Sequence, residues 1–230
     1  MKLQDAIVLI TGANRGIGLA FADAALARGA RKVYAGVRSP SNFSNRGFVP
    51  VKLDVTSDND VADAARICND ATLVINNAGI ALLGGLLKAG TSDTARVQLE
   101  TNVFGILRMT QAFAPVLAKN GGGAFLNVLS AASWINSGAL TAYAVSKAAA
   151  WSLTNGLRNE LRQQGTQVLG LHVGFVDTDL TRGLDVVKVS PQSVVATALD
   201  ALEAGASEVL ADERAQTIKR GLTTEPAVYL

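Results

Sequence analysis

The sequence has little of several residues that often carry chemistry. Its 230 residues include one cysteine, Cys68, and one histidine, His172. A single cysteine excludes an internal disulfide, and its place beside Ile67 in an expected helix predicts a small structural side chain rather than a nucleophile. His172 ends an apolar run, which favours a packed core position over a general base. No cluster of His, Cys and acidic residues indicates a metal site, so none is expected.

Charge and long hydrophobic runs are also scarce. Only 17% of the residues are charged, and the formal net charge of +2 is spread along the chain, which gives no electrostatic support for nucleic-acid or membrane-surface binding. The apolar run 6–10 is too short for a secretory signal or a membrane span, so we expect a cytoplasmic protein. With 49% hydrophobic residues, the chain should fold as a single domain over 1–230, apart from its last few residues.

Short β-branched runs alternate with longer Ala- and Leu-rich runs of helical period. This pattern predicts an α/β fold, a doubly wound parallel sheet (Rossmann fold) of about seven strands with helices on both faces. The expected strands are 6–11, 32–37, 49–53, 72–76, 124–130, 167–172 and 208–211. The expected helices are 16–28, 58–68, 92–119 with a break, 142–164 and 191–204, whereas 39–48 should be a loop.

Several helix ends carry recognisable signals. Ser57 precedes Asp60 as in a capping box, and Ser190 stands before a proline at the first helical position. Gly205 should close the last expected helix. The run after Asp212 is polar and then weakly apolar, and it receives no function.

A glycine-rich turn follows the first expected strand and opens the first expected helix, which is the setting of a phosphate-binding turn. In Thr11-Gly12-Ala13-Asn14-Arg15-Gly16-Ile17-Gly18, Gly12 should permit the tight turn and Gly16 the approach of a pyrophosphate. Gly18 should let the helix pack close to the strand, so that its N-terminal amides face the anion. The sequence therefore predicts dinucleotide binding here rather than an ordinary β–α turn.

The spacing Gly-xxx-Gly-x-Gly resembles that of the short-chain dehydrogenase/reductase family. Asn76-Asn77-Ala78-Gly79 at the end of the fourth expected strand and Tyr143-xxx-Lys147 match further motifs of that family, and the motif order agrees from residue 6 to about 180. The resemblance implies a compact nicotinamide-dependent oxidoreductase. Its implied cofactor contacts are Gly12, Asn14, Arg15, Gly16, Ile17, Gly18, Arg38, Asp54, Val55, Asn77, Ala78, Gly79, Tyr143, Lys147, Val176 and Thr178.

The type of nicotinamide cofactor can be argued from charge. An acid about twenty residues past the glycine turn would accept hydrogen bonds from a ribose hydroxyl, whereas an arginine there would accommodate a 2′-phosphate. Arg38 occupies this position, and Arg15 is a second cation within the turn. The two arginines predict NADP(H) rather than NAD(H).

Tyr143 and Lys147 are four residues apart and should share one helix face. A nearby ammonium favours the phenolate, so we expect Lys147 to lower the pKa of Tyr143. By resemblance, Lys147 would also bind the nicotinamide ribose. Ser130, thirteen residues before Tyr143, should close a strand and bind the substrate carbonyl, in preference to Ser133 and Ser137 on the following loop.

By the same resemblance, Asn102 at the helix break is the fourth catalytic residue and would hold a water that links Lys147 to solvent. Asn102, Ser130, Tyr143 and Lys147 together predict hydride transfer between NADP(H) and a small, apolar ketone, aldehyde or secondary alcohol. A protein that senses NADP on the same fold is the alternative. The family also implies a homodimer or homotetramer through the helices at 103–118 and 142–164, with Ala148, Trp151 and Leu153 as candidate contacts.

The resemblance weakens after the sixth strand. The family usually has Pro-Gly there, but this chain has Val173-Gly174, which constrains the backbone less. The short segment 179–189 contains Leu180 and Leu184, and it should form an open, apolar entrance for the substrate.

Overall fold

Seven parallel strands form one sheet in the described part of the chain. The structure is a computed structural model that describes residues 1–42, 47–136 and 138–230. The sheet order is β3-β2-β1-β4-β5-β6-β7, with every neighbouring pair parallel. The strands are β1 (Ile7–Thr11), β2 (Lys32–Val37), β3 (Val49–Lys52), β4 (Leu73–Asn76), β5 (Ala124–Val128), β6 (Gln167–His172) and β7 (Glu208–Leu210). The predicted parallel Rossmann sheet is confirmed.

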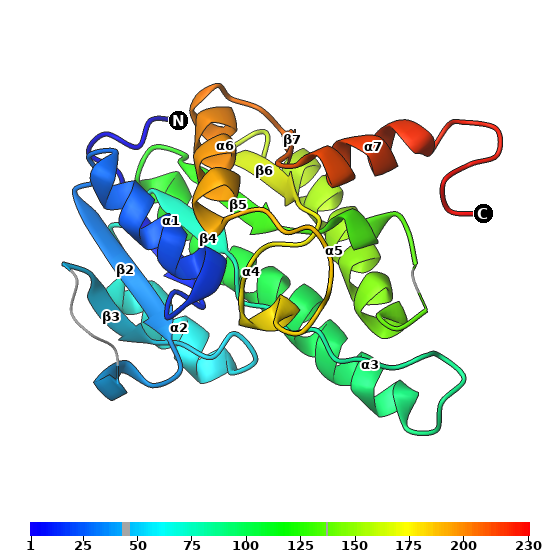
Figure 1. Cartoon of the computed structure of the whole chain (residues 1–230). Coiled ribbons are helices and arrows are strands. Elements are labelled where there is room, and N and C mark those ends of the chain that lie inside the picture. The colour runs from blue at the N-terminus through cyan, green and yellow to red at the C-terminus, as the bar shows by residue number, and fades with distance from the viewer. Residues whose placement is uncertain (43–46, 137) are drawn as a thin grey trace.

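Helices cover both faces of this sheet (Figure 1). On one face, α1 (Gly16–Ala27) and α6 (Pro191–Glu203) pack beside each other. The other face carries α2 (Asp58–Ile67), α4 (Gly105–Lys119) and α5 (Thr141–Glu160). Side chains of β1 alternate between the two cores, because Val8 and Ile10 join the first and Ile7 and Leu9 the second. Strands buried on both faces explain the near-continuous apolar runs in the sequence.

The sheet order changes direction at β1, which pairs with β2 on one side and β4 on the other. After β1 the chain continues to β2 on one side of the sheet, and after β4 it continues to β5 on the other side. A crevice at the carboxyl ends of the strands beside such a switch point is where open α/β sheets bind ligands. We therefore expect the ligand site at the carboxyl ends of β1, β4, β5 and β6.

The predicted break in the helix at 92–119 is a π-helical segment. α3 (Thr91–Leu99) continues through Glu100–Phe104 into α4, and the Gly105 amide bonds to the Glu100 carbonyl, five residues back. One extra residue is thus accommodated in the helix at Asn102. The predicted caps are also present, because the Ser57 and Ser190 side chains accept hydrogen bonds from the Asp60 and Ser193 amides.

The largest differences from the expected elements are at α5, at β5 and in the loop 39–48. α5 ends at Glu160 rather than 164, and β5 ends at Val128, so that Ser130 lies beyond the strand and caps a 3-10 turn at Ala131–Ser133. The expected loop 39–48 contains a short 3-10 turn, Pro40–Asn42, and its residues 43–46 lie outside the described residues.

The segment after Asp212 contains a helix that the sequence analysis missed. This helix, α7 (Glu213–Gly221), lies next to β7 and precedes the C-terminal segment, which extends away from the sheet (Figure 1). None of the described helices is long and apolar enough to cross a membrane.

Candidate active site

The glycine turn joins β1 to α1 with very little space between backbone segments. Gly12 has a φ of 66°, in the left-handed region that favours glycine. A Cβ at Gly18 would lie 2.2 Å from the Gly12 carbonyl oxygen and 2.5 Å from the Asn77 amide nitrogen. The first turn of α1 can therefore approach the strand only without a side chain at this position. No side chain caps this helix end, so its first amides are available to bind a pyrophosphate.

Asn77 and Thr11 tie this turn to the end of β4. The Asn77 side-chain amide donates to the carbonyls of Thr11 and Gly12, at 2.9 and 3.2 Å. In return, the Thr11 hydroxyl accepts from the backbone amides of Asn77 and Ala78, at 3.0 and 2.9 Å. Four hydrogen bonds thus hold the two dinucleotide segments in one fixed arrangement.

The two arginines of the cofactor prediction lie in different surroundings. The exposed Arg15 forms an ion pair with Asp179, which also pairs with Arg182, at the edge of a cavity of about 590 Å³. Arg38 is exposed just past β2. Hydrogen bonds from Thr56, with the nearby charge of Arg38 in addition, lower the pKa of Asp54. Of these two arginines, Arg15 is paired with a carboxylate and Arg38 forms no ion pair among the described residues.

The remaining predicted cofactor residues differ in how deeply they are buried. Thr178 lies beside the turn, because a Cβ at Gly16 would be 3.2 Å from its methyl group. Val55 and Val176 are buried, Ile17 is partly buried, and Asn14 is exposed. The structure brings the turn, Asn77–Gly79 and Thr178 together, as the sequence predicts.

Ser130 and Tyr143 line a common cavity. Burial raises the pKa of Tyr143 to about 12, and the Ser130 hydroxyl offsets only part of this effect. The expectation that Lys147 lowers this pKa is therefore wrong for the protein alone, because desolvation of the phenolate outweighs the favourable contacts. The Tyr143 phenol is therefore neutral at physiological pH. Ser133 is buried in the 3-10 turn, and Ser137 lies outside the described residues.

Lys147 is buried between the catalytic tyrosine candidate and the Asn77–Gly79 segment. Its Nζ donates to the Val128 carbonyl at 2.8 Å and lies 5.7 Å from the centre of the Tyr143 ring. A Cβ at Gly79 would lie 3.8 Å from the same Nζ. Burial lowers the pKa of Lys147 to about 8, so the group exchanges its proton close to neutral pH.

Asn102 is buried in the π-helical segment, and its side chain is fixed by three hydrogen bonds. Its amide nitrogen donates to the Ile80 carbonyl and the Ser146 hydroxyl, each at 2.9 Å, while its oxygen accepts from the Ile80 amide at 2.9 Å. Both amide hydrogens are therefore used. A water at Asn102 would have to bind an oxygen, of the side chain or of the main chain.

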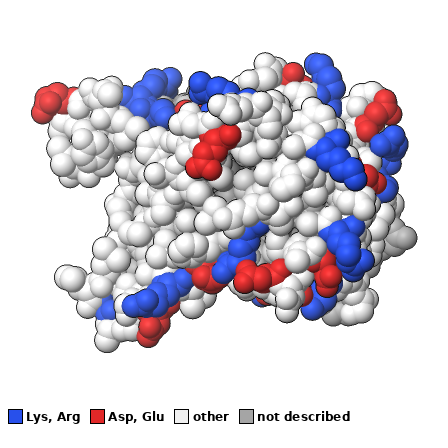
Figure 2. Space-filling view, turned by 180° about the vertical axis from the view of Figure 1, so that it is seen from behind, with Lys and Arg blue, Asp and Glu red and all other residues white. Residues whose placement is uncertain are grey.

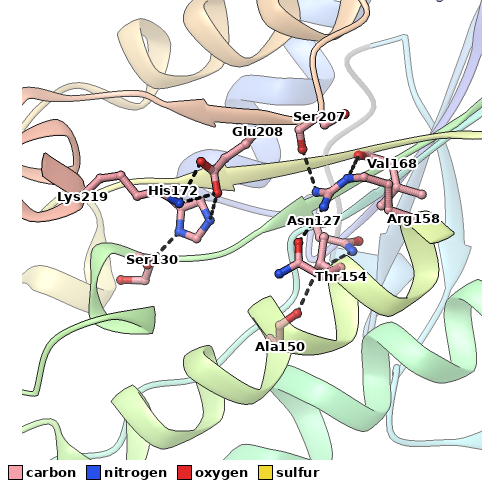
Figure 3. A network of polar contacts seen from close by, with 11 residues as sticks. Asn127, Ser130, Ala150, Thr154, Arg158, Val168, His172, Ser207, Glu208 and Lys219 are labelled. Atoms are coloured by element: carbon pink, nitrogen blue, oxygen red, sulfur yellow. Dashed lines mark hydrogen bonds and ion pairs between the residues drawn. The ribbon is translucent and has the colours of Figure 1, made fainter. Parts of the chain in front are cut away.

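His172 supports Ser130 from behind (Figure 3). Its Nδ1 lies 3.1 Å from the Ser130 carbonyl, and its ring stacks on Trp134 at 4.0 Å. Burial lowers the pKa of His172 to about 4, so the ring is neutral, and Nδ1 carries its proton because a carbonyl can only accept. His172 is fully buried, as the sequence predicts. Glu208, itself paired with Lys219 of α7, lies 3.5 Å from the other ring nitrogen.

The cavity at Ser130 and Tyr143 has a volume of about 200 Å³ and a largely apolar wall. Leu180 and Leu184 line it, as predicted. The same wall contains two arginines that were not predicted from the sequence, Arg182 and Arg214. Arg214 belongs to α7, and the Asp212 cap followed by basic residues near Gly221 could have indicated that helix.

Comparisons with known proteins agree with this geometry. The short chain dehydrogenase family matches residues 6–186. The chain belongs to the short-chain dehydrogenase/reductase family. Members of this family are oxidoreductases that use a nicotinamide cofactor. The narrow glycine turn and the free amides of α1 fit the pyrophosphate of that cofactor.

Individual members of the short-chain dehydrogenase/reductase family resemble the chain over most of its length. A short chain dehydrogenase from Burkholderia cenocepacia, in complex with NADP, is 39% identical with a TM-score of 0.94, covering 98% of this chain and 96% of that one. A family member from Burkholderia phymatum, in complex with NAD, is 21% identical with a TM-score of 0.85, covering 96% and 94%. A 3-oxoacyl-[acyl-carrier-protein] reductase from Vibrio harveyi is 29% identical, covering 80% and 79%.

Proposed function

We propose that this short-chain dehydrogenase/reductase is an NADPH-dependent carbonyl reductase for small substrates, with Asn102, Ser130, Tyr143 and Lys147 as its catalytic group. The observation that carries the proposal is the shared cavity of Ser130 and Tyr143 directly beside buried Lys147. Three groups suited to carbonyl chemistry thus meet beside the dinucleotide turn. The reverse reaction, oxidation of an alcohol, uses the same groups.

Tyr143, Ser130 and Lys147 have distinct tasks in the proposed reaction. When bound, NADPH supplies the hydride for the carbonyl carbon. Tyr143 donates its proton to the carbonyl oxygen, because its raised pKa keeps the phenol protonated at neutral pH. The Ser130 hydroxyl orients that oxygen by donating a hydrogen bond. The Lys147 ammonium, 5.7 Å from the Tyr143 ring, stabilises the phenolate that remains and returns a proton to it.

The preference for NADP rests on Arg38. Its guanidinium is exposed at the end of β2, where a 2′-phosphate would lie, and no ion pair among the described residues neutralises it. The relative from Burkholderia cenocepacia at 39% identity binds NADP, which supports the same choice. Arg15, by contrast, is paired with Asp179, so its positive charge is partly neutralised and attracts a phosphate less strongly.

The test is turnover of small ketones and aldehydes by Tyr143→Phe. We expect kcat to fall at least about 100-fold, because a general acid is lost, while NADPH binding stays close to normal. Lys147→Ala should lower kcat and also weaken NADPH binding. Ser130→Ala should have an effect intermediate between those of the other two variants, mainly on kcat. Tyr34→Phe is the matched control, since Tyr34 lies on β2 and the change removes a hydroxyl that is hydrogen-bonded to Lys32 and Asp70. A Tyr143→Phe enzyme that keeps more than a tenth of wild-type kcat would contradict the assignment, and NADPH binding without any turnover would favour the NADP sensor.

The same proposal includes a homodimer or homotetramer through α4 and α5. Figure 2 views the molecule from the side opposite to Figure 1, and its charged side chains gather towards the margins of a broad uncharged area. Phe104 and Val145 are exposed at the ends of these helices, whereas Trp151 and Leu153 pack partly against the protein's own core. Light scattering at micromolar concentration should find an oligomer that Phe104→Glu weakens. A monomeric wild-type protein would refute this part.

A further inference from the structure

The cavity at Ser130 and Tyr143 contains positive charge that the proposed reaction does not use. Two arginines line it, Arg182 and Arg214, and no acidic residue does so among the described residues. Arg182 is paired with Asp179. Arg214 has no carboxylate within ion-pair distance in the described part of the chain. Its charge is therefore free to meet a ligand.

Arg214 is held in place by contacts of the first turn of α7. The Asp212 carboxylate caps α7 by accepting from the Ala215 amide at 2.7 Å, and it also accepts from the Gly174 amide at 2.5 Å. A Cβ at Gly174 would lie only 2.9 Å from the Arg214 Cδ, so the stem of Arg214 packs directly on that glycine. One carboxylate and one glycine thus clamp α7 to the segment after β6.

The guanidinium of Arg214 lies over the Phe175 ring, 4.9 Å from its centre. This contact orients the plane of the guanidinium but leaves its charge without a counter-ion. Phe175, Gly174 and Arg214 all line the cavity that holds Ser130 and Tyr143. The arginine is exposed at the rim, so a ligand in the cavity can reach it without burying an unpaired charge.

We infer that the substrate is a small oxo acid or hydroxy acid whose carboxylate binds Arg214. This inference rests on the proposed reductase function and specifies its substrate class. The carbonyl lies at Ser130 and Tyr143, and a short hydrocarbon body lies against Leu180 and Leu184. The carboxylate accepts hydrogen bonds from the guanidinium, whose fork matches its two oxygens. The volume of about 200 Å³ restricts the body to a few carbon atoms.

The test compares 4-oxopentanoate, 5-oxohexanoate and 6-oxoheptanoate with the amide of each, using NADPH. At one chain length or more, the acid should have at least about tenfold higher kcat/KM than its amide. Arg214→Leu should remove this preference through KM for the acid and leave the amide within about twofold. Arg214→Lys should restore part of it. Arg220→Leu, a surface arginine of the same helix outside the cavity, is the matched control.

A binding measurement separates this inference from the proposed function. Hexanoate, but not hexanamide, should raise the Tm of the NADP-saturated wild-type protein, and Arg214→Leu should abolish the shift. Reduction of the neutral ketones with no acid preference would overturn the Arg214 inference and keep the reductase. Absence of turnover with a hexanoate shift that depends on Arg214 would overturn the reductase and keep the anion site. A hexanoate shift that Arg214→Leu leaves unchanged would overturn the inference.

Discussion

The cofactor side and the substrate side of this site are built by different means. On the cofactor side, the β1–α1 turn and the end of β4 are joined by backbone groups and by the side chains of Thr11 and Asn77. On the substrate side, the wall consists of separate side chains from short elements, such as Leu180, Phe175 and Arg214. A turn made of close backbone contacts tolerates almost no added atom. A wall of side chains can change its chemistry one residue at a time.

The most severe way to break the cofactor side is Gly18→Val. Its Cβ would lie 2.2 Å from a backbone oxygen, so the turn must shift, and we expect NADPH to bind at least about 100-fold more weakly by fluorescence titration. Gly156→Ala is the control, since its Cβ on α5 would have no atom within 4 Å. It should keep NADPH binding and stabilise the helix by about 0.5–1 kcal/mol. Normal affinity in Gly18→Val would show that the turn is adaptable.

Lys147 lies between the two sides, and its burial should be visible in the pH dependence of stability. Its pKa is about 8 in the folded protein and 10.5 ordinarily, so the unfolded chain binds more protons between these values. The free energy of unfolding should therefore rise with pH from this group, by about 2 kcal/mol between about pH 7.5 and 9.5. Urea titrations of Lys147→Met between pH 7.5 and 9.5 should lack that rise. An identical slope in both proteins would place the lysine in solvent.

Arg38→Asp should change the cofactor side without distorting it. The exposed guanidinium is replaced by an acid that repels a 2′-phosphate and can accept from ribose hydroxyls. We expect the ratio of kcat/KM for NADPH over NADH to fall about tenfold or more. Arg31→Asp, an exposed arginine before β2, should leave the ratio unchanged. Equal efficiency with both cofactors in the wild type would remove the basis of this prediction.

The smallest effect is expected on the substrate side, from Asp212→Ala. Loss of the α7 cap and of the bond to Gly174 should cost about 1 kcal/mol, which lowers Tm by roughly 2–4 °C. Substrate KM should rise a few-fold because Arg214 is less fixed, while NADPH affinity stays normal. Ser57→Ala, which removes the cap of α2, should lower Tm similarly and leave KM unchanged. An unchanged KM in Asp212→Ala would show that the position of α7 does not affect substrate binding.

The same contrast explains what could be predicted from the sequence. The glycine turn, Asn77 and the pair of Tyr143 and Lys147 could be found because short-range spacing fixes their geometry: a strand, a turn and one helix face. The parallel sheet could be found because strands buried on both faces leave apolar runs. Arg214 could not be predicted as a cavity residue, since its position there depends on a contact between α7 and a glycine 40 positions earlier in the chain.

The pKa of Tyr143 shows a second limit. The spacing to Lys147 correctly brings an ammonium near the phenol, at 5.7 Å from the ring. It says nothing about how much water both groups lose, and that loss controls the pKa. Burial is a property of the whole fold, so the direction of the shift could not be inferred from two residues on one helix.

The π-helical segment between α3 and α4 makes the fold sensitive to the number of residues in this part of the chain. Gln98, before the π-helical segment, accepts a hydrogen bond from the Leu82 amide, and Asn102, within the segment, accepts one from the Ile80 amide. These two side chains hold the neighbouring segment against one face of the helix. After it, Ile106 and Met109 face the sheet. Deleting a single residue between 100 and 104 would make the helix regular but turn everything beyond it by about 100°. Met109 would then face away from the core, so homologous chains should conserve the number of residues here more strictly than their identity.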